Sequence, residues 1–560
     1  MRSSGITPGP HQDRPRASVT DRLSARARDV TVFGHRIGDI VAGAQRRPVP
    51  LHWTSLFGVV TLASLTVVVV TGLVLMFFYT PSGEATTYAG SYGLLHGAEV
   101  SKAFASTMSI TFELPGGRVL RQAHHWAGLL LPASLALQLV TTFFTGAFRR
   151  PRRGMWLLLV VGFLCAVASG WSGYALPDDM LSGTGLRIVE GVALGIPVIG
   201  TWLASALFGG SFPGQIIEHL YPLHIVVFPV MLIVALAARA AAGWHHGPLQ
   251  FPGAGRTGQN IVGVPLLPTA LTRMTGLFLL VCGFVVAIAA TVTISPIWLS
   301  GPSDPGNAGA GSQPDWYTGF LDGALRLVPP GWEIVWLNRT WTLAVIAPLA
   351  VIGTFFVVLA AYPFAEEWVT GDRRTHDLLD RPRNAATRTG VGTAGLVFIG
   401  VLWAAGGADV IATAWSVSIE HVIMTLQIAL IGAPVIGFSV AQRVCLGLQR
   451  RDRTLLAHGV ETGRVVRLPG GGFTEVHRPL DDVERSRLAS PTPPPEPPIG
   501  PDRSGHRPLG RRARSQLWRM YVGGGIAVPD AADAEVVPTP DDRALAAGPT
   551  AAASAAARER

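Results

Sequence analysis

The sequence predicts an all-α, polytopic membrane protein that crosses the bilayer with eight helices. Of its 560 residues, 49% are hydrophobic and only 14% are charged, whereas about 25% of the residues of a typical soluble domain are charged. The mean hydropathy is +0.37. Several apolar runs reach about 20 residues, the length that a helix needs to cross the hydrocarbon layer. These observations exclude a soluble enzyme.

The apolar runs also set the expected topology. The eight expected spans are, in chain order, 54–78, 122–145, 156–176, 221–243, 273–294, 341–362, 391–412 and 419–441. Arginines gather around 149–153 and 373–388, so the positive-inside rule places these two loops in the cytoplasm. An even number of spans places both termini there as well, with the protein in the plasma membrane. Residues 185–208 are apolar but interrupted by Gly195 and Pro197, which favours a segment lying on the membrane surface.

Charge and cysteine content exclude other classes. The net charge is +9, but the arginines lie at the ends of apolar runs, where membrane orientation explains them without a nucleic-acid partner. The three cysteines are Cys165, Cys282 and Cys445, and they form no C-x-x-C pair and no C-x-x-C-H run. We therefore expect neither an iron–sulfur cluster nor covalently attached haem.

Composition divides the chain into four parts. Residues 1–50 form a basic cytoplasmic arm, and 51–245 and 246–441 each hold four spans. Residues 442–560 form a cytoplasmic tail whose proline-rich and alanine-rich stretches predict disorder over most of its length. Within that tail, the glycines at 470–472 indicate a turn.

Histidines stand at similar depth on two of the spans. His124 and His125 lie near the outer end of the second span, and His224 lies near the outer end of the fourth. Both helices run in the same direction, so two imidazoles can face each other and ligate one haem iron. The alternative is that these histidines are interfacial and bind water or headgroups. Spacing alone leaves both interpretations open.

Five stretches of sequence carry a family resemblance. They are His-His-Trp-Ala-Gly at 124–128, Phe-Phe-Thr-Gly-Ala-Phe-Arg-Arg-Pro-Arg at 143–152, Gly-Tyr-Ala-Leu-Pro-Asp-Asp at 173–179, Gln-Pro-Asp-Trp-Tyr at 313–317 and Gly-Leu-Gln-Arg-Arg-Asp-Arg at 447–453. Together they resemble the cytochrome b subunit of the actinobacterial cytochrome bc complex, a menaquinol:cytochrome c oxidoreductase. The resemblance extends over about residues 50–480.

The resemblance implies a fold and a function. Residues 51–245 would be the haem-binding bundle and 246–441 the half that carries the quinol-site loop. The chain would oxidise menaquinol at an outer site and pass electrons through haem b, as part of a translocase. The implied partners are a Rieske-type iron–sulfur subunit, a c-type cytochrome subunit, a second copy of the complex and membrane lipid.

The resemblance also assigns site residues. His124 and His224 would ligate haem iron, Arg121 would bind a propionate, and small residues would let the porphyrin approach the helices. These small residues are Gly58, Gly72 and Gly173.

A second set of residues would form the quinol site. Asp315 and Tyr317 would be catalytic, with Asp315 accepting a quinol proton, and Pro314 and Trp316 would line the same pocket. The alternative interpretation of this stretch is a proline-initiated turn with an N-capping aspartate.

The sequence departs from the family at the inner haem. In the family each of the two spans carries a second histidine, 14 or 15 residues further on. Gln138 stands 14 residues after His124, and Arg239 stands 15 after His224. Thr141 replaces the inner arginine, and Leu159 replaces an inner glycine. We therefore expect only the outer haem. The alternative is no haem at all, in a non-redox membrane scaffold or a quinone-binding accessory paralogue.

Overall fold

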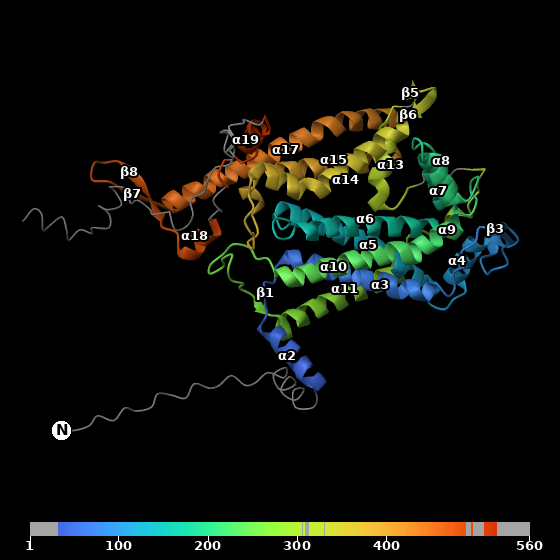
Figure 1. Ribbon diagram of the computed structural model, residues 1–560, viewed down its shortest axis with the longest axis horizontal. Coiled ribbons are helices and arrows are strands. Elements are labelled where there is room, and N and C mark those ends of the chain that lie inside the picture. Colours follow the sequence, from blue (N-terminus) through green and yellow to red (C-terminus); the bar gives the residue numbers. More distant parts are fainter. Residues whose placement is uncertain are drawn as a thin grey trace, which may run out of the picture.

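Eight long apolar helices form the body of the protein. The computed structural model describes residues 32–304, 306–307, 313–329, 331–488, 494–496 and 509–522. Within them, eight helices are long and apolar enough to cross a membrane: Trp53–Leu75, Gly117–Phe144, Arg153–Ala175, Ile216–His246, Leu266–Thr291, Leu343–Thr370, Ala386–Gly406 and Ile419–His458. This confirms the predicted number and order of spans. The long helices lie side by side, with short elements gathered at both ends (Figure 1).

The individual elements have the following bounds. The helices that make up the spans are α3 (Leu56–Leu75), α5 (Gly117–Phe144), α6 (Arg153–Ala175), α9 (Ile216–Pro222) with α10 (Phe228–His246), α11 (Leu271–Thr291), α14 (Leu343–Thr370), α15 (Ala386–Gly406) and α17 (Ile419–His458). The shorter helices are α2 (Val32–Arg46), α4 (Lys102–Phe112), α7 (Met180–Leu194), α8 (Gly200–Phe208), α12 (Ile297–Ser300), α13 (Gly319–Arg326), α16 (Ala408–Trp415), α18 (Asp482–Leu488) and α19 (Leu509–Tyr521).

Strands are few and short. They form four two-stranded antiparallel pairs: β1 (Pro48–Val49) with β4 (Val264–Pro265), β2 (Ala85–Thr87) with β3 (Glu99–Ser101), β5 (Glu333–Trp336) with β6 (Arg339–Thr342), and β7 (Val460–Arg467) with β8 (Phe473–Arg478). All of them lie in the connections between helices, as a polytopic helical fold requires.

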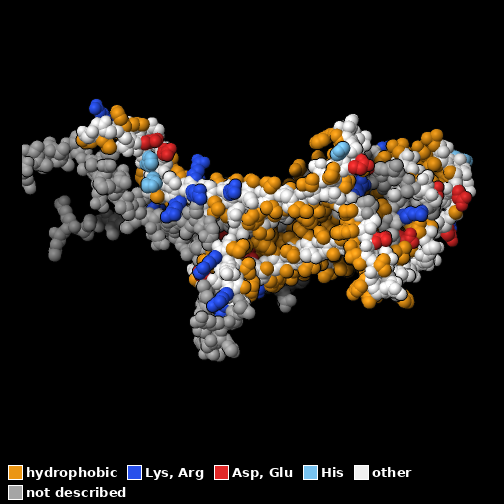
Figure 2. Space-filling model, turned by 90° about the horizontal axis from the view of Figure 1, so that it is seen from above, with side chains coloured by type: hydrophobic (Ala, Val, Ile, Leu, Met, Phe, Trp, Pro, Cys, Tyr) orange, Lys and Arg blue, Asp and Glu red, His pale blue; other side chains and the backbone are white. Residues whose placement is uncertain are grey.

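The surface of the helical body suits a lipid environment. Figure 2 shows a face whose middle is almost entirely hydrophobic, while charged side chains gather toward its two ends. Leu280 on α11, Val357 on α14 and Ile431 on α17 are among the exposed apolar side chains. Because lipid tails solvate such side chains, this pattern is that of an integral membrane protein.

The fourth span contains a local irregularity beside a predicted ligand. A π-helical turn, η3 (Leu223–Val227), joins α9 to α10 and holds His224. Pro222 and Pro229 flank this turn, and neither can donate the backbone hydrogen bond of a regular helix. A π turn adds one residue to the helical repeat, which explains why fifteen residues after His224, not fourteen, return to the same face.

The loop that precedes α13 is held by close helix packing. α13 lies against α15, and a Cβ added to Gly323 would come within 1.8 Å of the Leu402 carbonyl oxygen. Gly406 makes the same kind of approach to Gly319, where an added Cβ would lie 2.3 Å from the carbonyl oxygen. Small residues at these points therefore fix the position of α13, which follows Tyr317 directly.

Three connecting segments refine the expected organisation. The apolar stretch 185–208 forms parts of α7 and α8 and is not among the spans, as predicted. The last membrane helix continues to His458 rather than ending at 441, because its polar end binds a neighbouring loop: Asp452 pairs with Arg383, and Gln449 Nε2 donates to the Arg383 carbonyl oxygen. The predicted turn at 470–472 joins β7 to β8. Within the tail for which disorder is predicted, residues 489–493, 497–508 and 523–560 fall outside the described residues.

Candidate haem and quinol site

A cavity of about 350 Å³ lies inside the first helical bundle. Its walls come from α3, α5, α6 and the η3–α10 segment, together with residues of the 295–317 loop. Most of the lining is aliphatic. The polar side chains that enter it include those of Arg121, His124, His224, Asp315 and Tyr317. An apolar cavity with a few convergent polar groups is the usual form of a cofactor site.

His124 and His224 face each other across this cavity. Their ring centroids are 6.1 Å apart. That leaves room for one metal ion between the rings, because a bond from a metal to an imidazole nitrogen is about 2 Å long. The two rings come from α5 and η3, as the sequence predicts, so the geometry favours the ligand interpretation over interfacial histidines.

Hydrogen bonds orient both imidazole rings. His224 Nδ1 lies 2.9 Å from the Ser169 carbonyl oxygen, which can only accept, so Nδ1 carries the proton. His124 Nδ1 lies 3.0 Å from Thr71 Oγ1, whose own proton goes to the Val67 carbonyl oxygen. In each ring the Nε2 lone pair is therefore left for a metal.

Two glycines make room for these rings. A Cβ added to Gly173 would lie 2.5 Å from His224 Cε1, and one added to Gly72 would lie 3.0 Å from His124 Cε1. Gly72 and Gly173, both predicted for this site, thus contribute by leaving room for the two histidine rings. Gly58 does not line the cavity, because it lies about four turns away toward the other end of α3. The assignment of Gly58 to a haem site stays a prediction.

Arg121 supplies a cationic group without a complete set of partners. One of its nitrogens, Nη2, donates to the Ser295 carbonyl oxygen at 3.1 Å. The other, Nη1, is buried and has no hydrogen-bond partner. A buried guanidinium nitrogen left in this state costs free energy unless a ligand binds it. Because Arg121 lines the cavity, a haem propionate fits this orphaned donor.

Asp315 and Tyr317 occupy the outer wall of the same cavity. The Tyr317 hydroxyl donates to Asp315 Oδ2 at 2.8 Å, and His125 Nε2 lies 3.3 Å from Asp315 Oδ1. The Tyr317 side chain is buried, with 2% of its surface exposed. Burial, reinforced by the Asp315 carboxylate, raises the pKa of Tyr317 well above its ordinary value, so the phenol stays protonated and keeps donating. His125 thus pairs with Asp315 at the outer wall, and His124 is the histidine of α5 that faces His224.

The flanking residues of the tetrapeptide lie elsewhere. Neither Pro314 nor Trp316 lines the cavity, so their assignment to a quinol pocket stays a prediction. Trp316 is 38% exposed, and its carbonyl oxygen accepts from Trp403 Nε1 at 2.9 Å, so it ties the loop to α15. Asp315 precedes a 3₁₀ turn, η5 (Trp316–Thr318), but its side chain makes no capping bond there. The Asp315 carboxylate therefore does not cap this turn, as the alternative interpretation would require.

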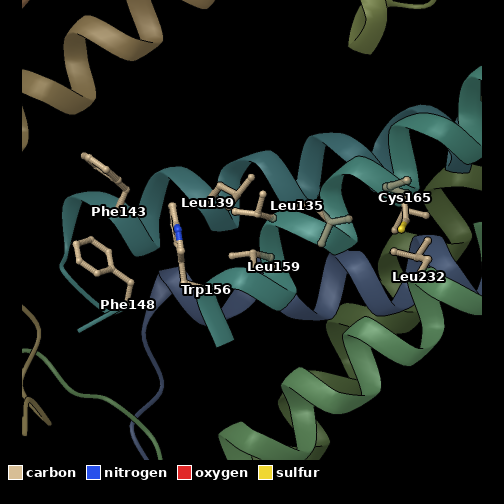
Figure 3. Packing of buried hydrophobic residues seen from close by; sticks show 11 residues of the cluster. Leu135, Leu139, Phe143, Phe148, Trp156, Leu159, Cys165 and Leu232 are labelled. Carbon is tan, nitrogen blue, oxygen red and sulfur yellow. The ribbon is translucent and has the colours of Figure 1, made fainter. Parts of the chain in front are cut away.

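Side chains fill the region where an inner haem would lie. Leu159 is fully buried and packs in one cluster with Leu135, Leu139 and Trp156. Figure 3 shows this cluster extending between α5 and α6 as far as Phe143 and Phe148. This cluster borders the cavity, since Leu131, Ala166 and Leu232 belong to the cluster and also line the cavity.

The residues that replace the inner ligands are engaged with protein. Gln138 Nε2 donates to Thr61 Oγ1 at 2.7 Å, and Thr61 in turn contacts Ser134 at 2.7 Å. The Thr141 hydroxyl donates to the Leu137 carbonyl oxygen of its own helix. Arg239 lies three residues after Leu236, whose methyl group approaches Gly162 of α6. Its position on α10 therefore faces α6, on the side where the second ligand would stand.

Sequence reasoning missed the groups that orient the ligands. Thr71 and the Ser169 carbonyl lie on helices other than those of the histidines that they bind. A hydroxyl residue inside an apolar span beside Gly72 was the available signal for Thr71. Gly170 was also missed: an added Cβ would lie 2.5 Å from the Tyr317 hydroxyl, so only glycine admits that ring.

Eight membrane helices, with a cavity in the first bundle that holds two facing imidazoles and an orphaned arginine, are the fold and site of a membrane cytochrome of the b type. Residues 129–302 match the family described as cytochrome b(N-terminal)/b6/petB. The chain is 41% identical over 477 residues to the cytochrome bc1 complex cytochrome b subunit of Streptomyces coelicolor, covering 83% of this chain and 87% of that protein. Identity to the same subunit of Mycobacterium tuberculosis is 40% over 476 residues, covering 83% and 85%. The chain belongs to the family of cytochrome bc1 complex cytochrome b subunits.

A comparison of folds agrees with this assignment. A chain of a hyperthermophilic respiratory Complex III superposes with a TM-score of 0.54 at 16% sequence identity, covering 77% of this chain and 100% of that one. Membership in the family means that the protein is an integral membrane subunit of a bc1-type respiratory complex, an oxidoreductase, and implies haem b as its cofactor.

Proposed function

We propose that this chain oxidises menaquinol at the outer wall of the cavity and holds a single b-type haem behind it. The observation that carries the proposal is the meeting of two kinds of group in one cavity. Two imidazoles that face each other, each with a free Nε2 lone pair, lie deep in it. The Asp315–Tyr317 pair lies at its outer wall. When bound, haem b supplies a one-electron acceptor next to the quinol.

The residues of the chain have distinct tasks in this reaction. Asp315 accepts a proton from the quinol hydroxyl as the electron leaves, which is general base chemistry. Tyr317 donates to Oδ2, which leaves Oδ1, the oxygen that faces His125, to take the proton. His124 and His224 hold iron, and Arg121 Nη1 binds a propionate. The Gly72 and Gly173 backbones keep the two imidazoles in place.

The proposal of a single haem rests on the filled inner region. Leu159 is completely buried in a cluster that includes Leu135, Leu139 and Trp156, and Gln138 is bonded to Thr61. From the level of His124 to that of Gln138 the helix rises about 21 Å. Without an inner haem, the electron that the outer haem takes from menaquinol would have no acceptor across that distance, and the other electron would leave through the iron–sulfur subunit.

The proposed assembly follows from the family and from charge. Relatives are named as subunits of a cytochrome bc1 complex, so we assign a Rieske-type iron–sulfur subunit, a c-type cytochrome subunit and a homodimeric complex as partners. Arg149, Arg150, Arg152 and Arg153 all pair with acids at one end of the helical body. By the positive-inside rule, that end and both termini lie in the cytoplasm of a cell whose plasma membrane holds the complex.

Haem stoichiometry tests the proposal. The purified chain should contain one non-covalent haem b per polypeptide, measured by pyridine haemochrome, with one b-type band in the reduced-minus-oxidised spectrum. A value near zero would favour a non-redox scaffold or a quinone-binding accessory subunit. A value near two would contradict the filled inner region.

Restoring the inner site is expected to depend on Leu159. The double substitution Gln138→His and Arg239→His should leave haem content at one per chain. The reason is that a porphyrin would still overlap the Leu159 side chain, and overpacking costs about 1–3 kcal/mol. Adding Thr141→Arg and Leu159→Gly should raise haem content toward two, again measured by pyridine haemochrome. A second haem in the double variant would contradict this account. The absence of a second haem from a folded quadruple variant would contradict it as well.

A further inference from the structure

An exposed apolar hairpin precedes the sixth span. Strands β5 and β6 pair from Glu333↔Thr342 to Trp336↔Arg339. The turn residues Leu337 and Asn338 both have positive φ, which forms the tight turn typical of two-residue hairpins. Val335 is 75% exposed and Trp336 is 62% exposed. Large apolar side chains that are exposed next to each other mark a surface that contacts something other than water.

The hairpin is amphipathic. Because side chains alternate along a strand, Ile334 and Trp336 point to one face, and Trp341 joins them because it pairs with Ile334. The Trp341 indole donates to the Trp336 carbonyl oxygen at 2.9 Å, which holds the two rings together. The opposite face carries Glu333, Val335, Thr340 and Thr342. One face thus holds both tryptophans of the hairpin, and the other has a single apolar side chain among polar ones.

The position of the hairpin identifies the contact. α14 begins at Leu343, directly after β6, and the Leu343 N–H closes the hairpin by donating to the Trp332 carbonyl oxygen at 2.9 Å. The hairpin therefore stands at the level where a membrane helix enters the bilayer. In Figure 1 it projects beyond the ends of α14 and α17, away from the bundle. Exposed apolar side chains follow on α14 as well, among them Leu349 and Val351.

We propose that the β5–β6 hairpin is a membrane-surface anchor whose Ile334–Trp336–Trp341 face lies among the lipid headgroups. Tryptophan is the residue that favours this zone, since its ring is apolar and its N–H is polar. The hairpin connects α13 to α14, so the anchor fixes the depth of the loop that carries Tyr317. This inference goes beyond the proposed function, because lipid contact at this face depends on neither haem nor quinol. A partner subunit covering the same face is the alternative that the test must separate.

Spin labels on opposite faces of the hairpin test the anchor. Ile334→Cys and Thr340→Cys would be labelled in the full chain, in nanodiscs of phosphatidylcholine and phosphatidylglycerol, with the unsubstituted protein correcting for its native cysteines. Leu280→Cys on the lipid-exposed side of α11 gives the lipid reference, and Ser91→Cys in an exposed loop gives the water reference. Collisions with oxygen report lipid, and collisions with a water-soluble nickel chelate report water.

The two faces should give opposite results. The label at 334 should resemble that at 280, with a ratio of oxygen to nickel accessibility severalfold above the ratio at 340. Equal ratios at 334, 340 and 91 would overturn the anchor. A label at 334 shielded from both reagents would show that protein covers this face, and would overturn it as well. Neither result would change the haem content that tests the proposed function.

Discussion

His224→Ala is expected to give a folded membrane protein that retains no haem. The two imidazoles are the pair of nitrogen ligands that face each other in the cavity, and the rest of its lining is mainly aliphatic. With one ligand removed, a single imidazole remains in a site built for two, and the iron is held weakly. His124→Ala should have the same effect. Haem per polypeptide, measured by pyridine haemochrome, should fall from one to near zero.

The neighbouring histidine provides a matched control. His125 lies next in sequence, but its ring contacts Asp315 at 3.3 Å and not the other imidazole. His125→Ala should therefore keep its haem and its b-type spectrum. Full haem in His224→Ala would disprove the ligand assignment, and haem loss in His125→Ala would show that the two adjacent histidines have been assigned in the wrong order.

Much of the fold follows from the sequence because its main signal is local. A run of about 20 apolar residues suffices to specify a membrane helix, so the eight spans could be predicted without knowledge of their packing. Where the polar end of the last helix binds Arg383, the prediction ended too early, because that contact joins residues 69 positions apart. The β5–β6 hairpin was not predicted for a related reason, because its aromatic residues were interpreted as the edge of an apolar span.

The site could be predicted in part. The sequence identified His124 and His224, but it could not separate His124 from His125, since adjacent residues differ by about 100° around a helix. Only tertiary partners settle that choice: Thr71 for one ring and Asp315 for the other. The π turn at His224 accounts for the fifteen-residue spacing, but its position depends on how two prolines are accommodated.

The resemblance assigns more residues than the wall of this cavity holds. Gly58, Pro314 and Trp316 belong to family patterns, yet the structure places none of them on the cavity wall. Pattern membership reports shared ancestry of a segment, whereas a site needs a side chain or backbone that reaches the ligand. Asp315 and Tyr317 do reach the cavity, and their hydrogen bond explains why the two act together.

Asp315→Asn is expected to lower the rate of quinol oxidation by a factor of about 10²–10⁴, the usual contribution of a positioned general base, while haem content stays at one per chain. Asparagine keeps the size of the side chain and can still accept from the Tyr317 hydroxyl, so the cavity should be preserved. The amide cannot take the quinol proton, however. The rate of cytochrome c reduction by a menaquinol analogue, per haem, measures the effect in the purified complex.

Tyr317→Phe separates the carboxylate from its partner. It removes the hydroxyl that donates to Oδ2 at 2.8 Å but leaves the base itself. We therefore expect a smaller loss of rate than in Asp315→Asn. The rate of cytochrome c reduction per haem measures this difference. A native rate in Asp315→Asn would exclude Asp315 as the base, and would move the proton acceptor to another group at the outer wall.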